Sequence, residues 1–104
     1  MSNLLKVCDI NEIPVDTLLR KSIRGSSIIL IKKNNSVYAI ENQCSHMNYP
    51  LSDGELNQYE IECIYHGAKF DIRNGEPTSL PATENIRTYE VVIKEEEVFI
   101  CIDE

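Results

Sequence analysis

The sequence lacks any long hydrophobic run, and this absence limits where the protein can work. Its longest aliphatic stretch, Ile28–Ile31, is far shorter than the roughly 20 apolar residues that a transmembrane helix needs. The N-terminal residues Met1–Asn3 lead directly into the strand-like segment 4–7, without the basic and then apolar order of a secretory signal. We therefore expect a protein that is not inserted in a membrane and that stays in the cytoplasm.

Basic side chains are also in deficit, since 10 lysines and arginines stand against 17 aspartates and glutamates, giving a net charge of −7. Residues 1–50 hold six basic and four acidic side chains, whereas residues 51–104 hold four basic and thirteen acidic ones, so the halves carry +2 and −9. Nucleic acid is excluded as a favoured partner by this charge. A basic protein surface is the complementary partner, although the acidic residues could equally serve only to keep the domain soluble.

Histidine is scarce, and the only two histidines of the sequence each lie close to a cysteine. The two pairs are Cys44-Ser45-His46 and Cys63-Ile64-Tyr65-His66, separated by residues 47–62. This arrangement predicts a metal site with two sulfur and two imidazole ligands. A structural zinc finger usually pairs cysteine with cysteine and histidine with histidine, whereas each pair here is mixed. Two thiolates on one iron and two imidazoles on its neighbour form the ligand set of a Rieske [2Fe–2S] centre.

The cysteine count of four would permit two disulfides in a secreted chain. Without a signal segment we expect reduced thiols, so metal ligation is the better use of Cys44 and Cys63. Cys8 and Cys101 lie in apolar stretches near the two ends. We interpret both as buried thiols that pack as small hydrophobic side chains.

A sustained 3.6-residue periodicity is missing as well, which favours an all-β domain built from short antiparallel strands in a sandwich or partly open barrel. Turn residues such as Gly, Pro and Asn separate the apolar segments. The expected strands are 4–8, 17–23, 28–32, 37–40, 59–63, 69–72, 87–94 and 98–102. The expected turns are 24–27, 33–36, 73–76 and 95–97, of which 73–76 contains the hairpin-forming pair Asn-Gly, and 79–82 is expected to be a stiff loop.

The run C-S-H-M-N-Y-P-L-S-D-G-E-L, followed by C-I-Y-H-G-A-K-F-D-I-R-N-G-E and L-P-A, resembles the Rieske ferredoxin family. The resemblance is strong from about Ser36 to Ile102. It implies one domain over residues 1–104, with a base of β-sheets and a small cluster-binding subdomain inserted over about 42–80. It also implies a single [2Fe–2S] cluster, in which Cys44 and Cys63 bind one iron, and His46 and His66 bind the other through Nδ1.

The resemblance further predicts a low reduction potential. Tyr49 and Tyr65 stand where the high-potential members have two disulfide-forming cysteines. Ala68 and Phe70 stand where those members have a serine and a tyrosine whose hydroxyls donate to cluster sulfurs. Such donors stabilise the more negative, reduced cluster, so their loss predicts a potential near the −150 mV end of the Rieske range. Ile64 replaces the proline that usually follows the second cysteine.

The function implied by the resemblance is that of a monomeric electron carrier, not an enzyme, which moves one electron from a flavin-dependent reductase to a terminal oxygenase. An alternative is a small Rieske-type subunit of another multicomponent reductase, such as nitrite reductase. A zinc-binding interaction module could use the same four ligands. A Cys–His nucleophilic enzyme would leave the second cysteine–histidine pair unexplained. A respiratory-chain subunit would need a membrane anchor and the disulfide cysteines.

Overall fold

The structure is a computed structural model that describes residues 2–34, 36–43, 50–63, 67–79 and 84–103. These residues form three antiparallel sheets and two short 3₁₀ helices. The terminal sheet has the order β1-β11-β10, the central sheet β2-β3-β4-β9 and the small sheet β5-β6-β7-β8. The expected all-β, antiparallel architecture is therefore confirmed. The elements are β1 (Ser2–Asp9), η1 (Ile10–Glu12), β2 (Leu19–Ile23), β3 (Ser26–Lys33), β4 (Ser36–Glu41), η2 (Leu51–Asp53), β5 (Glu55–Asn57), β6 (Glu60–Glu62), β7 (Lys69–Asp71), β8 (Pro77–Ser79), β9 (Thr88–Tyr89), β10 (Val91–Lys94) and β11 (Glu97–Asp103).

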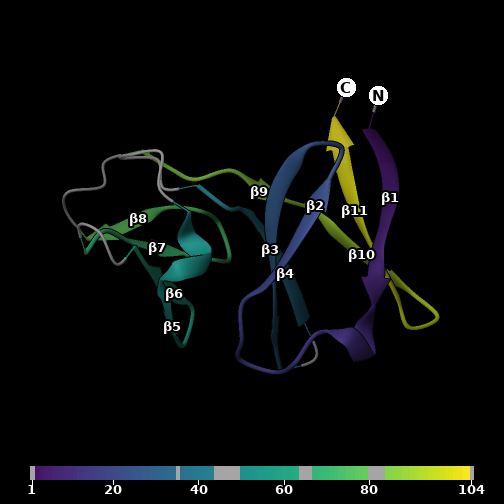
Figure 1. Cartoon of the computed structure of the whole chain (residues 1–104), viewed down its shortest axis with the longest axis horizontal. Coiled ribbons are helices and arrows are strands. Elements are labelled where there is room, and N and C mark those ends of the chain that lie inside the picture. The colour runs from purple at the N-terminus through teal and green to yellow at the C-terminus, as the bar shows by residue number, and fades with distance from the viewer. Residues whose placement is uncertain (1, 35, 44–49, 64–66, 80–83, 104) are drawn as a thin grey trace.

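The central sheet lies between the other two, with the small sheet on one side and the terminal sheet on the other (Figure 1). Strand β3 shows why its sequence is apolar without alternation. Its residues Ile29 and Ile31 enter the core shared with the small sheet, whereas Ile28 and Leu30 enter the core shared with the terminal sheet. Because both faces of β3 are buried, every position from 28 to 31 must be apolar.

Two-residue turns with positive φ angles connect several of the strands. Between β2 and β3, Arg24 and Gly25 have φ angles of 51° and 81°, and between β10 and β11, Glu95 and Glu96 have 48° and 71°. Both residues of a type I′ turn have positive φ, and this turn matches the twist of antiparallel strands. The first turn is shorter than expected, because Ser26 and Ser27 already belong to β3.

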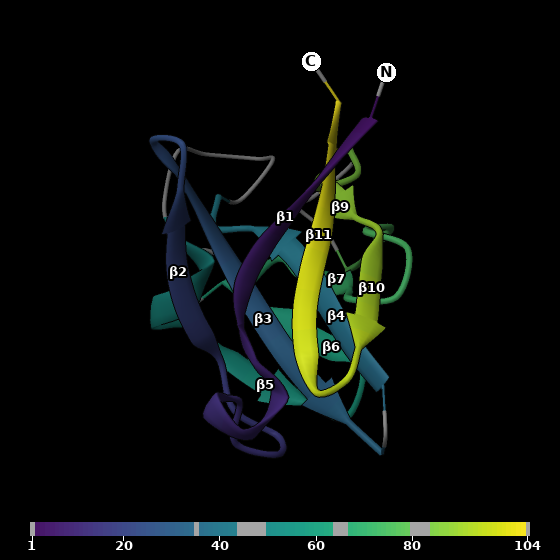
Figure 2. The same cartoon turned by 90° about the vertical axis from the view of Figure 1, so that its right-hand side faces the viewer.

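One expected strand, 87–94, is wrong as a single element. Its first part, β9, pairs with β4, and its second part, β10, pairs with β11, so the chain passes from the central to the terminal sheet at Glu90. Figure 2 shows β9 and β10 as separate arrows. The Glu90 carbonyl accepts a hydrogen bond from the Cys101 N–H at 2.9 Å. A bend of this kind forms the corner where a strand changes sheets.

The turn after β7 is also wider than the Asn-Gly pair predicts. The Asp71 N–H donates to the Glu76 carbonyl at 2.8 Å, and Gly75 N–H donates to the Asp71 carbonyl at 2.7 Å. One carboxylate oxygen of Asp71 accepts the Arg73 N–H, and the other accepts its guanidinium at 2.7 Å. These local bonds stabilise a longer loop. They also lower the pKa of the Asp71 carboxyl, chiefly through the side-chain hydrogen bond from Arg73.

Tyr59 links the small sheet to the central sheet. Its ring contacts that of Tyr38 edge-on, with centroids 6.1 Å apart, and the Arg73 guanidinium lies 4.4 Å from its centroid. Its hydroxyl accepts a hydrogen bond from Asn34 at 3.1 Å, and Lys33 lies 5.5 Å from the ring centroid. Edge-to-face rings and cation–π contacts are favourable at these separations. Tyr59 therefore fixes the position of the sheet that carries the second cysteine–histidine pair.

The two cysteines outside the pairs differ in burial. Cys8 is 4% exposed and packs in the core beneath the terminal sheet, as expected, and this burial raises the pKa of its thiol. Cys101 is only half-buried, so the expectation that it would be buried is wrong. The reason is strand alternation, because Val98 and Ile100 take the inward positions of β11 and Cys101 faces outward.

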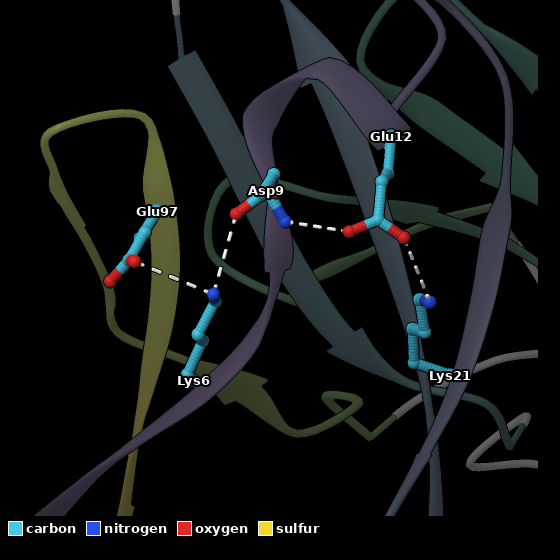
Figure 3. A network of polar contacts seen from close by, with 5 residues as sticks. All are labelled: Lys6, Asp9, Glu12, Lys21 and Glu97. Carbon is cyan, nitrogen blue, oxygen red and sulfur yellow. Dashed lines mark hydrogen bonds and ion pairs between the residues drawn. The ribbon is translucent and has the colours of Figure 1, made fainter.

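A polar network joins β1, η1, β2 and β11 (Figure 3). Lys6 lies 3.4 Å from both Asp9 and Glu97, and Glu12 accepts the Asp9 N–H at 2.8 Å while lying 3.6 Å from Lys21. These side chains are largely exposed, so each ion pair stabilises the fold only slightly. Among the residues that the structure describes, no helix has the length and apolarity needed to span a bilayer.

Candidate metal centre

The structure describes one of the four predicted ligands, Cys63. The other three, Cys44, His46 and His66, lie outside the described residues, as do Tyr49, Ile64 and Tyr65. Within the described ranges, no group of three or more His, Cys, Asp and Glu side chains is arranged to hold a metal ion. The geometry therefore concerns Cys63 and the residues that flank the two cysteine–histidine pairs.

Cys63 and Gly67, the described residues on either side of residues 64–66, continue the β6–β7 hairpin. Cys63 N–H donates to the Ala68 carbonyl at 2.7 Å, and Gly67 N–H donates to the Cys63 carbonyl at 2.9 Å. Gly67 has a φ of 71°, which glycine adopts at little cost. These bonds extend the strand pairing Glu62↔Lys69 by one more residue pair. Cys63 is therefore held by backbone bonds at the base of a short loop that contains His66.

The surroundings of Cys63 are apolar. Cys63, Leu51, Ala68 and Phe70 are all 0% exposed and belong to the core between the small and central sheets. A charged thiolate is costly to bury in such surroundings unless a cation balances it. A metal ion bound at the edge of this core would supply that balance.

The residues that flank the two pairs meet through their backbones at Gly54. The Gly54 N–H donates to the Leu51 carbonyl at 2.9 Å. A Cβ atom added to Gly54 would lie 1.9 Å from the carbonyl oxygen of Glu62, the residue before Cys63. The segment that follows the first pair therefore packs directly against the strand that precedes the second. This contact joins residues that follow the first pair in the sequence to the residue directly before Cys63.

Ala68 and Phe70, which the sequence marks as lacking hydroxyl donors, are both fully buried near Cys63 in the chain. Ala68 follows the loop of the second pair directly, and Phe70 is the central residue of β7. Neither side chain can donate a hydrogen bond. Their positions agree with an apolar surrounding for a metal centre.

The outer face of the small sheet is acidic. Glu55 pairs directly across from Glu62, and Glu60 pairs across from Asp71. Like charges opposite each other on antiparallel strands are destabilising. Their side chains lie on the face opposite the buried Ile61. Two basic side chains lie beside them, since Lys69 pairs across from Glu62 and Arg73 forms an ion pair with Asp71, so the face is acidic in sum and only partly balanced.

Sequence reasoning missed two residues that bond around the first pair. Asn42 makes side-chain hydrogen bonds to Ser27 and Ser52. Glu41 accepts the Arg87 N–H at 2.7 Å, while its own N–H donates to the Arg87 carbonyl at 2.9 Å. The available signal was the polar pair Glu41-Asn42, which directly follows the apolar residues 37–40 and is separated from Cys44 by Gln43 alone. Their partners lie far away in the sequence, so the signal alone did not identify them.

Comparisons with known proteins agree with this geometry. A family model described as the Rieske [2Fe-2S] domain matches residues 3–90. The ferredoxin component of the naphthalene 1,2-dioxygenase system of Pseudomonas aeruginosa is 37% identical over 89 residues, covering 86% of each chain. The ferredoxin subunit of the 3-phenylpropionate/cinnamic acid dioxygenase of Photorhabdus laumondii is 36% identical over 105 residues, covering 100% of this chain and 98% of the relative.

Solved structures give the same result. One contains the reduced oxygenase and oxidised ferredoxin of carbazole 1,9a-dioxygenase in a complex, and its matching chain superposes with a TM-score of 0.87. That chain is 34% identical, and the match covers 93% of this chain and 91% of the other. The family match over most of the sequence and the likeness in fold lead to one conclusion: this chain belongs to the Rieske [2Fe-2S] domain family.

Proposed function

We propose that this protein carries single electrons from a flavin-dependent reductase to a terminal oxygenase. The observation that carries the proposal is its similarity, over the whole chain, to a ferredoxin subunit of a ring-hydroxylating dioxygenase. A second support is the structural match to a ferredoxin that was solved together with its oxygenase. The relatives named as ferredoxin components are electron carriers within multicomponent systems, which is the role proposed for this chain.

Family membership implies one Rieske-type [2Fe–2S] cluster, and the residues of this chain fit it. The sequence offers the required donor set of two thiols and two imidazoles in mixed pairs. We assign Cys44 and Cys63 to one iron, and His46 and His66 to the other. Support comes from Cys63, which is buried at the base of a hydrogen-bonded loop beside the flank of the first pair.

The bound cluster would supply reversible one-electron chemistry, and the surrounding residues would set how readily it is reduced. Leu51, Ala68 and Phe70 keep water away from Cys63, since all three are fully buried. Neither Ala68 nor Phe70 has a hydroxyl that could stabilise the reduced state by donating to sulfur. The proposal therefore includes a low potential, near the −150 mV end of the Rieske range.

The acidic outer face of the small sheet is proposed as the surface that meets a basic redox partner. Glu55 and Glu62 lie on it directly opposite each other, and Glu62 precedes the ligand Cys63 in the chain. Complementary charge raises the rate of encounter, and the effect weakens as salt screens it.

This surface is tested with cytochrome c, a basic electron acceptor. The reduced protein should reduce it quickly at low salt, and the rate should fall as salt increases. Glu55→Gln and Glu62→Gln should slow the low-salt rate, whereas Glu95→Gln and Glu96→Gln in the remote β10–β11 turn (Figure 1) should leave it nearly unchanged. Equal effects of the two pairs of substitutions would show that net charge, not this face, controls the rate.

The function itself is tested by coulometric titration together with iron and sulfide analysis. The proposal expects iron and acid-labile sulfide in equal amounts and the uptake of one electron per chain. A colourless protein that contains zinc and takes up no electrons would instead support an interaction module. The proposal also includes a monomer in the cytoplasm, where a reducing environment keeps ligand thiols available to iron. Size-exclusion chromatography and cell fractionation test these two points.

A further inference from the structure

Asn42 joins three segments of the chain through one side chain. Its Oδ1 accepts the N–H of Ser52 at 2.7 Å. Its Nδ2 donates to the Ser52 hydroxyl at 3.1 Å and to the Ser27 hydroxyl at 3.0 Å. Its own backbone N–H donates to the Ser27 carbonyl at 3.0 Å. Asn42 therefore connects the start of β3, the end of β4 and the short helix η2.

The bond to Ser52 replaces a cap that the helix cannot make for itself. The N-cap residue of η2 is Pro50, and it makes no side-chain capping bond. The first N–H groups of a helix need acceptors, which an N-cap side chain with an oxygen usually provides. Here Asn42 provides the oxygen from ten residues earlier in the sequence. The helix is thus stabilised only when Asn42 and Ser52 are held together.

The position of this contact gives it a functional meaning. Cys44 and His46 lie between Asn42 and Ser52 in the sequence, so the contact closes the loop that carries the first cysteine–histidine pair. Beyond Ser52, Gly54 packs against the Glu62 backbone next to Cys63. Glu41, the residue before Asn42, is in turn bound to Arg87 by two hydrogen bonds.

We propose that Asn42 is a positioning residue for the first cysteine–histidine loop, fixing its two ends so that its ligands are held toward those of the second loop. The proposal rests on the proposed function, since it assumes that Cys44 and His46 bind the cluster. Asn42 itself binds no iron and takes no part in the electron transfer. Its effect is to restrict the loop to one geometry, and the stability and potential of the cluster depend on that geometry.

Three variants of Asn42 and one control separate this role from ordinary stability. Asn42→Ala and Asn42→Leu remove all three side-chain bonds. Asn42→Asp keeps an oxygen to accept the Ser52 N–H, and its second oxygen can accept from the serine hydroxyls. Asn11→Ala, at an exposed asparagine in η1, is the matched control.

The readouts are the exchange rate of the Ser52 amide, the half-life of the visible cluster absorbance in a chelator, and the midpoint potential. In Asn42→Ala and Asn42→Leu, we expect the Ser52 amide to exchange about tenfold faster, the cluster to be lost several-fold faster, and the potential to shift. Asn42→Asp should restore most of the amide protection and of the cluster half-life, while its added negative charge lowers the potential. Asn11→Ala should change none of the three.

An Asn42→Ala protein that keeps the wild-type potential and cluster half-life overturns the positioning role, even if its melting temperature falls. Unchanged exchange of the Ser52 amide overturns the capping contact itself. If the wild-type protein contains no iron, the proposed function fails. The contact is then still decided by Ser52 amide exchange in the protein as purified, so the two failures are distinguishable.

Discussion

Replacing Gly54 by alanine tests the backbone contact between the segment after the first cysteine–histidine pair and Glu62, the residue before Cys63. Gly54 has φ −87° and ψ −167°, which is extended backbone that any residue can adopt. The need for glycine is therefore one of space. The added methyl carbon would lie 1.9 Å from the Glu62 oxygen, 3.0 Å from the Glu62 carbonyl carbon and 3.1 Å from the Leu51 oxygen. All three are backbone atoms, so no side-chain rotation can relieve the clash.

The expected cost follows from these distances. Ordinary contact begins near 3.5 Å, so the Glu62 backbone would have to move by more than an ångström. Overpacking of this kind costs about 3 kcal/mol, which corresponds to a fall in melting temperature of roughly 12–24 °C for a domain of this size. Because β6 leads into Cys63, we also expect cluster absorbance to be lost at temperatures where the wild-type protein keeps it.

Gly25→Ala is the matched control. At Gly25 the backbone conformation disfavours alanine but the space for a Cβ atom is free, whereas at Gly54 the conformation is allowed and the space is filled. Gly25 has a φ of 81°, but nothing lies within 4 Å of an added Cβ. Its cost should be conformational only, about 1 kcal/mol, without effect on the cluster. Thermal unfolding and visible absorbance, measured on the same samples, compare the variants. A Gly54→Ala protein that melts within a few degrees of Gly25→Ala and keeps its cluster would refute the reasoning.

Three further predictions concern charge, ring contacts and potential. The pKa of Asp71 is lower in the folded than in the unfolded protein, where it is about 3.9. The ionised Asp71 therefore stabilises the fold at pH values above about 3.9, and this stabilisation is lost as the pH falls through the folded-state pKa. Asp71→Asn should therefore cost about 0.5–1 kcal/mol at pH 7 and progressively less below pH 4 in urea titrations, and an equal cost at every pH would contradict the ion pair with Arg73. Tyr59→Leu should cost about 1–2 kcal/mol in urea unfolding through its lost ring and cation contacts, and no loss would mean that the link between the sheets is not stabilising. Ala68→Ser should raise the midpoint potential in a spectroelectrochemical titration by about 60 mV if the hydrogen bond from its hydroxyl to a cluster sulfur is about 1.4 kcal/mol stronger in the reduced than in the oxidised state. An unchanged potential would show that residue 68 does not contact the cluster.

Much of the fold was predictable because apolar runs and turn residues are local signals. The strands around Ile28–Ile31 and Val98–Ile100 were expected from their side chains alone. Strands β5 and β8 were not expected, because the alternation of apolar and polar residues does not extend beyond their three residues, as it does in 59–63 around β6, and because β8 begins with Pro77. The break at Glu90 was missed because segment 87–94 reads as one strand, whereas its first part pairs with β4 in the central sheet and its second part pairs with β11 in the terminal sheet.

In the candidate site, too, local features could be predicted from the sequence and tertiary contacts could not. The pairing of each histidine with a cysteine is visible in the sequence, and this pattern of residue types is enough to predict the ligand set. The contacts that hold the flanks of the site were not visible, because Asn42 meets Ser27 and Ser52, and Gly54 meets Glu62, only after the strands have paired. Residue type suggests what a site can bind, whereas the partners that position it are set by the tertiary fold.

The central claim is that two imidazole nitrogens and two thiolate sulfurs hold one iron–sulfur cluster asymmetrically. Nitrogen electron–nuclear double resonance on the dithionite-reduced protein tests it most directly. We expect a rhombic iron–sulfur signal with strong couplings to two ligand nitrogens, one of which disappears in His46→Cys and the other in His66→Cys. A cluster signal without strong nitrogen coupling, or a reconstituted protein without iron, would contradict the claim.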